Sequence, residues 1–435
     1  MFQIEGEKMA EINNELLDYL NSIEIFDTHE HLPPYEDARF KDTDVLKEYM
    51  TQYISTDMIS AGLPVKELEK LFDTTIPLMD RWMIAEKYWN ICRYTGHGRA
   101  LDLSVKKLYG IDNINRDNIE DLNAHFQKSL QPGHYRKVLK ELSKIRISIN
   151  DRIENQSLDC DEEYFKSACH LNHFMAPSNK HSLAQVEEEG ELRVSSFDNW
   201  LLSCEKAFNK AFEKGAVCIK FDHAYSRTLK HDLVARQEAE QGFHHIFDTD
   251  SQYEWRPQVQ LNKSKAFEDY MVHFILTLAN ESGRIIQIHT GGVWGQNGNN
   301  VDNANPIHLN NLFLRYPNVK FDIFHIGYPF QHILGALAKS FPNVYIDMCW
   351  AHIISPTASI NALREWIDSV PLNKISAFGG DYCIIDAIVG HQKIARENVS
   401  RALSEAIFDG VFDINEAKKI GKMLLHDNPS ELFEC

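Results

Sequence analysis

Short runs of apolar residues alternate with longer amphipathic stretches along most of this chain. The apolar runs predict buried strands, because they are short and rich in Val, Ile and Phe. They lie at residues 23–27, 145–150, 164–171, 217–221, 284–289, 319–325, 343–348 and 375–379. Apolar positions at helical spacing predict helices at 8–22, 197–214, 264–282, 306–316, 330–341, 359–369, 391–408 and 415–425.

Strands that alternate with helices indicate parallel βαβ units. Eight strands is the number found in a (β/α)8 TIM barrel, and this is the fold that we predict. A doubly wound open sheet is the rival fold. It would normally carry a glycine-rich phosphate turn after an early strand, and the sequence contains neither GxGxxG nor GxxxxGK[ST].

One long region departs from the alternation. Between about residues 42 and 143 the pattern is helical, and about a hundred residues pass without a convincing strand. We predict a helical insertion after the first strand, covering the mouth of the barrel. The whole chain, 1–435, is then one barrel domain with this insertion.

The charge of the chain argues against nucleic acid and membranes as partners. The chain of 435 residues has 45 Lys and Arg against 63 Asp and Glu, a formal net charge of −18. Without a basic cluster, neither nucleic acid nor an anionic membrane surface is an expected partner. The 8 Cys include no CxxC pair, and no apolar run reaches the roughly 18 residues of a membrane span. We therefore expect a soluble cytoplasmic protein acting on a small molecule.

Histidine, lysine and aspartate residues stand at the ends of five predicted strands. The first strand runs into His29 and His31, and the fourth ends in Lys220. The fifth ends in His289, the sixth in His325, and the eighth runs into Asp381. Because the carboxyl ends of all barrel strands meet at one mouth, we expect these side chains to lie together.

Imidazoles with one carboxylate are a typical ligand set for a divalent transition metal. Zn²⁺ fits first, and Fe²⁺, Mn²⁺ and Co²⁺ also fit. A strand-end histidine alone is more often structural, and an HxH pair alone is weak evidence. The ordered combination over strands one, five, six and eight is strong evidence. Such a metal would bring the pKa of a bound water toward ~7.

The motifs around these residues resemble the amidohydrolase superfamily of metal-dependent barrel hydrolases. The similarity is greatest to the amidohydrolase-like domain that is fused to glutamine synthetase in some fungal and plant proteins. Uronate isomerases, which have a similar insertion, are more distant. The matching stretches are FDTHEHL (26–32), GAVCIKFDHAYSR (215–227), IIQIHTGG (285–292), NPIHL (305–309), VKFDIFHIGYP (319–329), FGGDY (378–382) and DNPSELF (427–433).

The resemblance implies roles for these residues. His29, His31 and Asp381 would be metal ligands, with His289 a fourth ligand or a near neighbour. Asp381 would also be the general base, and His325 would polarise the substrate or move protons. Some members bind two ions bridged by a carbamylated lysine, and Lys220 stands at that place. The number of ions, one or two, therefore stays open. It also stays open whether Lys220 is carbamylated and bridges two ions or is unmodified and contacts substrate.

Three further residues follow the strand ends closely enough to bind substrate. Arg227 could hold a substrate carboxylate, Trp294 could form an apolar wall, and Tyr328 follows the sixth strand. Asp27 and Glu30 are candidates to orient the imidazoles from behind.

These features predict a metal-dependent hydrolase that acts on a small polar molecule, with a C–N bond preferred. A uronate-type isomerase and a metal-dependent decarboxylase are the alternatives. A scaffold that has lost catalysis is disfavoured by the intact ligand set. Barrels of this kind often self-associate, so a homo-oligomer is a further expectation.

Overall fold

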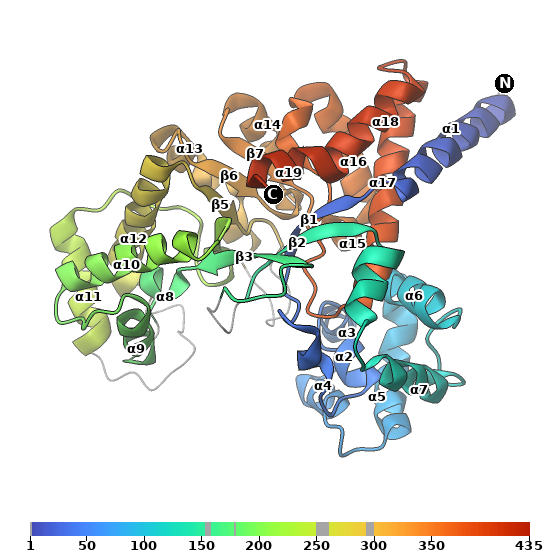
Figure 1. Ribbon diagram of the computed structural model, residues 1–435, viewed down its shortest axis with the longest axis horizontal. Coiled ribbons are helices and arrows are strands. Elements are labelled where there is room, and N and C mark those ends of the chain that lie inside the picture. Colours follow the sequence, from blue (N-terminus) through green and yellow to red (C-terminus); the bar gives the residue numbers. More distant parts are fainter. Residues whose placement is uncertain (1, 153–157, 178–179, 249–260, 293–299) are drawn as a thin grey trace.

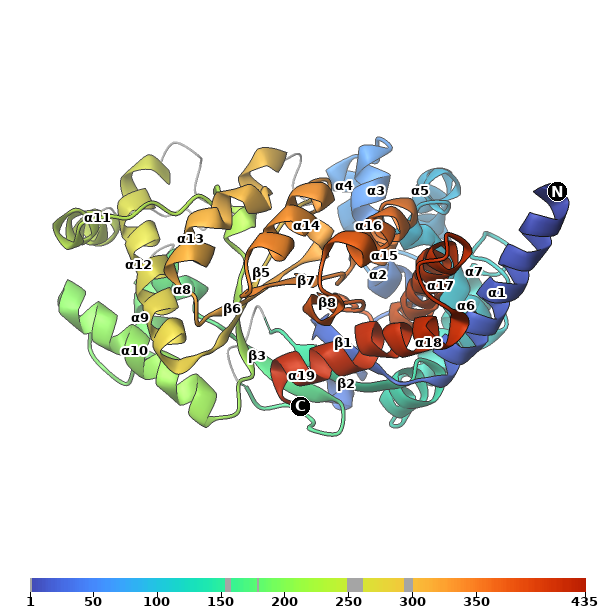
Figure 2. The same cartoon turned by 90° about the horizontal axis from the view of Figure 1, so that it is seen from above.

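Eight parallel strands form the centre of the molecule, in the order β1 to β8. The computed structural model describes residues 2–152, 158–177, 180–248, 261–292 and 300–435. The strands are β1 (Ile25–Glu30), β2 (Ile145–Asn150), β3 (Phe165–His170), β4 (Cys218–Phe221), β5 (Ile285–Ile288), β6 (Lys320–Ile323), β7 (Val344–Asp347) and β8 (Ile375–Ser376). The predicted (β/α)8 barrel is thereby confirmed (Figure 2).

The barrel closes between β8 and β1 through backbone hydrogen bonds beyond the short strand β8. Thr28 N donates to Phe378 O at 3.1 Å, and Asp381 N donates to His29 O at 2.8 Å. Strand β1 also runs through His29 to Glu30, farther than the hydrophobic pattern predicts. The reason is that the polar residues of this strand, like its apolar ones, are all buried. The residues predicted to bind metal are therefore part of the barrel wall.

Helices follow most strands and surround the barrel (Figure 1). Before β1 lies α1 (Phe2–Ser22). After β3 come α8 (Asn172–Met175), α9 (Lys180–Glu189) and α10 (Phe197–Glu213), and after β4 come α11 (Arg236–Asp248) and α12 (Leu261–Ser282). Next are α13 (Asn310–Arg315), α14 (Gln331–Ser340), α15 (Ala351–Ile354), α16 (Pro356–Ser369), α17 (Ala387–Phe408), α18 (Ile414–Lys422) and α19 (Asn428–Phe433). Among the described helices, none is long and apolar enough to cross a membrane.

The segment between β1 and β2 is helical, as its periodicity predicts. It contains α2 (Val45–Tyr49), α3 (Ile54–Ser60), α4 (Val65–Leu71), α5 (Leu78–Cys92), α6 (Gly96–Tyr109) and α7 (Ile119–Ser129), followed by a π-helical turn, Arg136–Leu142. Figure 1 shows these helices grouped on one side of the barrel. Helix α6 packs closely on α17, where a Cβ at Gly390 would lie 1.9 Å from Ala100 O. Gly390 therefore allows the insertion to approach the helix that follows β8.

The amino-terminal end of the barrel is plugged by the last helix. Phe433 of α19 stacks on Phe26 of β1 with ring centroids 5.9 Å apart. Phe26 and Phe433 also pack in one buried cluster with Ile149, Cys218 and Leu432. Access to the barrel interior is therefore from the other end, where the strands deliver their polar residues.

Candidate metal centre

His29, His31 and Asp381 form a close group at the mouth of the barrel. One ligand atom from each lies within 4.8 Å of the other two. Asp381 Oδ1 is 3.1 Å from His31 Nε2 and 3.5 Å from His29 Nε2. The structure thus brings together the two ends of the chain that the sequence predicted to share an ion, since β1 and β8 are neighbours across the barrel closure.

The loop after β8 presents Asp381 in a strained conformation. Its φ is 60°, in the left-handed region that non-glycine residues seldom adopt. The carbonyl of Asp381 accepts hydrogen bonds from Tyr53 Oη and, at 3.1 Å, from Gln52 Nε2. Gln52 and Tyr53 belong to the insertion, so the insertion helps to hold the loop of Asp381 in place. The residue before Asp381 is glycine because a Cβ at Gly380 would lie 1.7 Å from Glu30 Oε1.

The hydrogen bonds of His31 define which ring nitrogen faces Asp381. His31 Nδ1 lies 2.8 Å from the backbone carbonyl of Asp151, so Nδ1 carries the proton. Nε2 then points its lone pair at the Asp381 carboxylate, and an extra proton or a metal ion must lie between the two acceptors. Burial lowers the pKa of His31, but the hydrogen bond to Asp381 and the charge of Asp151 outweigh it and raise that pKa.

A second pair of imidazoles, from β5 and β6, shows the same arrangement. His325 Nδ1 lies 2.8 Å from Cys349 O, and His289 Nε2 lies 3.2 Å from Gly292 O. Cys349 O takes the proton of His325 Nδ1, which leaves Nε2 of the neutral His325 ring as an acceptor. This Nε2 is 3.1 Å from His289 Nδ1, a hydrogen-bond distance. The single proton of a neutral His289 therefore goes either from Nδ1 to His325 Nε2 or from Nε2 to Gly292 O.

Burial keeps most of these imidazoles neutral. It holds the pKa of His29 and of His289 well below the ordinary value, with a positive neighbour adding to the effect in each case. It also lowers the pKa of His325 to about 4, against the opposing charge of Asp381. Burial alone would raise the pKa of Asp381, but the hydrogen bond to His31 and the nearby imidazoles hold it well below its usual range. Neutral imidazoles and an ionised carboxylate are the forms that ligate metal.

Lys220 lies inside this group, at the end of β4. Its Nζ is 3.1 Å from His29 Nε2 and 3.8 Å from Asp151 Oδ2, and it lies over the ring of Phe324 at 4.4 Å. The side chain is buried, with a relative accessibility of 4%. Its amine is therefore placed to touch a ligand of the ion, and its predicted role as a bridge or substrate contact stays a prediction.

The other predicted substrate residues have different surroundings. The guanidinium of Arg227 is buried against α12, where Nη1 donates to Glu268 at 3.0 Å and Nη2 donates to Asp269. A substrate carboxylate would have to compete with these two acids, and the predicted role of Arg227 in binding substrate stays a prediction. Tyr328 is half-buried on the loop after β6, where its backbone lies against Gly291. Trp294 lies outside the described residues.

Asp27 and Glu30 support backbone rather than imidazole rings. Asp27 accepts hydrogen bonds from Gly380 N at 3.0 Å and from His29 N at 3.2 Å. Glu30 accepts one from Tyr382 N at 2.7 Å. Burial raises the pKa of Asp27 to about 6 and that of Glu30 well above its usual range. Both acids thus fix the loop that carries Asp381.

Sequence reasoning missed several residues at the mouth. Asp151 directly follows β2, lies 3.4 Å from His29 Nε2 and is paired with His170, the last residue of β3. The strand-end rule that found the other ligands could have found both. Tyr225, about 40% exposed, stands over His289 with ring centroids 4.4 Å apart. No sequence pattern pointed to Tyr53, because this residue lies in the helical insertion and not at the end of a strand.

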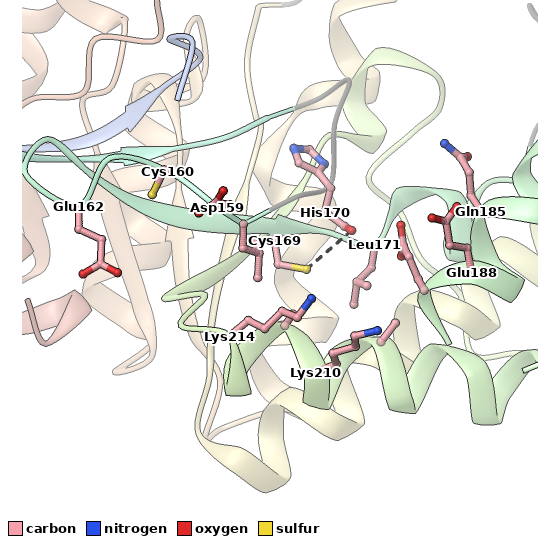
Figure 3. Close-up of a pocket in the computed structure, with 14 residues that line it drawn as sticks. Asp159, Cys160, Glu162, Cys169, His170, Leu171, Gln185, Glu188, Lys210 and Lys214 are labelled. Carbon is pink, nitrogen blue, oxygen red and sulfur yellow. Dashed lines mark hydrogen bonds between the residues drawn. The ribbon is translucent and has the colours of Figure 1, made fainter. Parts of the chain in front are cut away.

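A separate cleft of about 740 Å³ lies outside the barrel, between β3, α9 and α10 (Figure 3). Lys210 enters it from α10, Lys214 from the residue that follows this helix, and Glu188 from α9. His170 borders this cleft, but its ring points away from the two lysines in Figure 3 and pairs with Asp151. The cleft is therefore behind the wall of the barrel and not part of the ligand group.

Comparisons with known proteins show which family the chain resembles. Residues 242–433 match the family model described as amidohydrolase, which confirms the resemblance to the amidohydrolase superfamily. This segment holds His289, His325 and Asp381. The ligand groups described above fit the metal on which this family depends.

One protein is similar to this chain in sequence, and three solved structures are similar to it in fold. Protein FluG of Emericella nidulans is 26% identical over 178 residues, which are 40% of this chain and 20% of the relative, so the chain matches about a fifth of that protein. Among solved structures, a uronate isomerase from Thermotoga maritima has a TM-score of 0.78 at 17% identity, with 97% of each chain covered. A glucuronate isomerase from Caulobacter crescentus has a TM-score of 0.77 at 16% identity, covering 98% of this chain and 94% of that one. A protein described as a metal-dependent hydrolase from Lactobacillus casei has a TM-score of 0.65 at 16% identity, covering 96% and 97%.

Proposed function

We propose that this protein is a metal-dependent hydrolase that uses the Asp381 carboxylate as its base. The observation that carries the proposal is the position of this carboxylate between the two imidazole pairs. Oδ1 is 3.1 Å from His31 Nε2, and Oδ2 is 4.0 Å from His325 Nε2. His29, His31 and Asp381 would hold a divalent ion, Zn²⁺ by preference, with His289 close by on the far side of His325. Such an ion acts as a Lewis acid and brings the pKa of water toward about 7.

The chain's own groups supply the proton transfers. Asp381 is ionised at neutral pH and accepts a proton from the attacking water, which it then returns to the leaving group. His325 has its Nδ1 proton committed to Cys349 O, so its free Nε2 accepts a proton and does not donate one. With the first ion alone bound, we therefore assign His325 the proton-moving role of the two roles considered for it.

The substrate that suits this site is a small polar molecule with a hydrolysable C–N bond. Lys220 brings its amine to the ligand group, 3.1 Å from His29 Nε2, and Tyr225 and Tyr53 add phenol groups close by. Hydroxyl groups of this kind orient polar substrates by hydrogen bonds. Because Arg227 is paired with two acids of α12, the proposed substrate does not depend on a carboxylate group.

A uronate-type isomerase is the second candidate, and one observation favours it. The two isomerase structures cover nearly the whole chain, 97% and 98%, with the two higher TM-scores of the three comparisons given above. Both isomerases are only 16% to 17% identical to this chain, so the likeness supports the fold and leaves the reaction open.

Turnover in isotopically labelled water separates these candidates. The purified, zinc-loaded protein is offered a panel of small amides, cyclic amides and lactones, and in parallel a panel of hexuronates. Hydrolysis places one labelled oxygen in the product for each bond cleaved. Conversion of a hexuronate into a product of the same molecular mass would instead establish the isomerase and reject the hydrolase.

A further inference from the structure

A buried thiol faces the same carboxylate from the end of the neighbouring strand. Cys349 follows β7 and is 0% exposed. Its Sγ and one ligand atom each from His325 and Asp381 all lie within 4.8 Å of one another. Asp381 is thus common to two groups of three ligand atoms, one with His29 and His31 and one with His325 and Cys349.

The backbone fixes the direction of this sulfur atom. A Cβ at Gly379 would lie 2.8 Å from Cys349 Sγ, so the sulfur rests directly on the loop that carries Asp381. Cys349 N donates to Asp347 Oδ1 at 2.7 Å, and Cys349 O accepts the Nδ1 proton of His325 at 2.8 Å. These two bonds hold the backbone of Cys349 on both sides of its side chain. The sulfur itself rests against Gly379, two residues before Asp381.

The second group also contains an unprotonated nitrogen atom. His325 Nδ1 donates to Cys349 O, so Nε2 of the neutral ring keeps its lone pair. His289 Nδ1 lies 3.1 Å from that lone pair. A cation held by His325, Cys349 and Asp381 would take His325 Nε2 as a ligand, and His289 would then direct its proton from Nε2 to Gly292 O, 3.2 Å away.

We propose that Cys349 is a thiolate ligand of a second metal ion, which it holds together with His325 and Asp381. The inference rests on the proposed function for the first ion, held by His29, His31 and Asp381. Binding releases one proton, since the Cys349 S–H bond is replaced by a bond from sulfur to the metal. Sulfur, nitrogen and oxygen ligands together favour Zn²⁺, or Co²⁺ in its place, over the hard cations Mg²⁺ and Ca²⁺.

A role as a nucleophile fits this thiol less well. Burial raises the pKa of Cys349 well above its ordinary value, and the charges of Asp381 and Asp347 add to the effect. Without a metal the sulfur is therefore a neutral thiol, which is a weak nucleophile. A metal ion is the neighbour that would ionise it.

Zinc X-ray absorption of the intact, zinc-loaded protein tests the proposal directly. We expect two zinc ions per chain and a sulfur scatterer at about 2.3 Å, distinct from nitrogen and oxygen at about 2.0–2.2 Å. With one sulfur for two ions, the fitted sulfur number is expected to be roughly one half per zinc. Since this spectrum is taken on the wild-type protein, it does not depend on how a variant folds.

A variant with a matched control adds a second readout. Cys349→Ala is expected to retain one zinc and to lose the sulfur signal, and its cobalt form is expected to lose the sulfur-to-cobalt charge-transfer absorption. Cys204→Ala removes an equally buried thiol from α10, and it is expected to keep both ions and the sulfur signal.

The outcomes separate this inference from the proposed function. Zinc without sulfur rejects Cys349 as a ligand and leaves the first ion in place. One zinc whose shell includes sulfur overturns the two-ion assignment, because the ion then lies at Cys349 and the site of the first ion is empty. No bound zinc at all overturns both. Two zinc ions whose sulfur signal survives in Cys349→Ala would show that the sulfur comes from another residue, and this too rejects the assignment.

Discussion

Strained backbone collects at the residues that would do the chemistry. At the ends of β6, β7 and β8, φ is 62° at His325, 52° at Ile326, 59° at Trp350 and 60° at Asp381. Each such conformation costs about 1–3 kcal/mol and persists only where the surroundings impose it. Trp350 is held by a hydrogen bond from its N to Gly379 O at 2.9 Å and by the ring of Tyr53, whose centroid is 4.3 Å from its own. The strain fixes the direction of the ligands before substrate arrives.

Replacing Asp381 by Asn should remove most activity while the protein still folds. The amide keeps the shape of the side chain but cannot accept the water proton, and general-base catalysis typically contributes about 10²- to 10⁴-fold. The measurement is kcat on the substrate found in the labelled-water assay, with circular dichroism to check the fold. Wild-type kcat in Asp381→Asn would reject Asp381 as the base.

Replacing His31 by Ala should lower the amount of metal bound. His31 Nε2 offers a lone pair toward Asp381, and its ring is 14% exposed, so the loss opens no large internal cavity. Metal content after dialysis is measured by mass spectrometry. The control is His332→Ala on α14, whose side chain is 71% exposed, and equal metal content in the two variants would contradict the ligand assignment.

At the scale of elements, one buried carboxylate connects the helical insertion to the mouth of the barrel. Asp386 precedes α17 and is fully buried. It accepts hydrogen bonds from Tyr49 of α2 at 2.7 Å and Tyr109 of α6 at 2.6 Å, and His134 lies 2.6 Å from it. Since Asp381 is five residues earlier, these helices restrain the loop that presents it.

Tyr109→Phe should destabilise the protein by about 1.5–3 kcal/mol, the usual contribution of a hydrogen bond to a charged group. The measurement is the free energy of unfolding in urea. Tyr94→Phe is the matched control, because Tyr94 is 78% exposed, and it should change stability by less than about 0.5 kcal/mol. A neutral result for Tyr109→Phe would mean that water replaces the lost bond.

The same carboxylate predicts a dependence of stability on pH. Burial would raise the pKa of Asp386, but the hydrogen bond and charge of His134 outweigh it and hold the pKa far below its usual range. A depressed pKa in the folded state stabilises the protein above the unfolded-state pKa of about 3.9, and this stabilisation is lost as pH falls toward the folded value. The stability difference between wild type and Asp386→Asn should therefore shrink below about pH 4. A difference that stays constant to pH 2 would contradict this account.

At the scale of the whole molecule, the proposed first ion lies where the barrel closes. His29 and His31 come from β1 and its end, whereas Asp381 follows β8, which is only two residues long. An ion shared by them would join the two strands whose backbone ladder is shortest. Binding would therefore stabilise the closed barrel as well as supply the chemistry.

Loading with zinc should accordingly raise the melting temperature, and a chelator should lower it. At a free metal concentration one hundred times Kd, binding to the folded state alone adds about 2.7 kcal/mol. Thermal unfolding followed by circular dichroism measures the shift. The His31→Ala variant serves as the control, and an equal shift in it would place the stabilising ion elsewhere.

The sequence by itself determined the barrel and where its chemistry is found. Strands and helices are local patterns, and parallel strands bring their carboxyl ends to one mouth wherever the connecting helices lie, so His29, His31, His325 and Asp381 could be assigned to it without coordinates. Which groups meet there was decided by the tertiary structure, because ring tautomers, ion pairs and sulfur contacts depend on neighbours far away in the chain. Arg227 follows its strand as expected but is occupied by two acids of α12, and the thiol of Cys349 faces Asp381 only because β7 and β8 lie side by side.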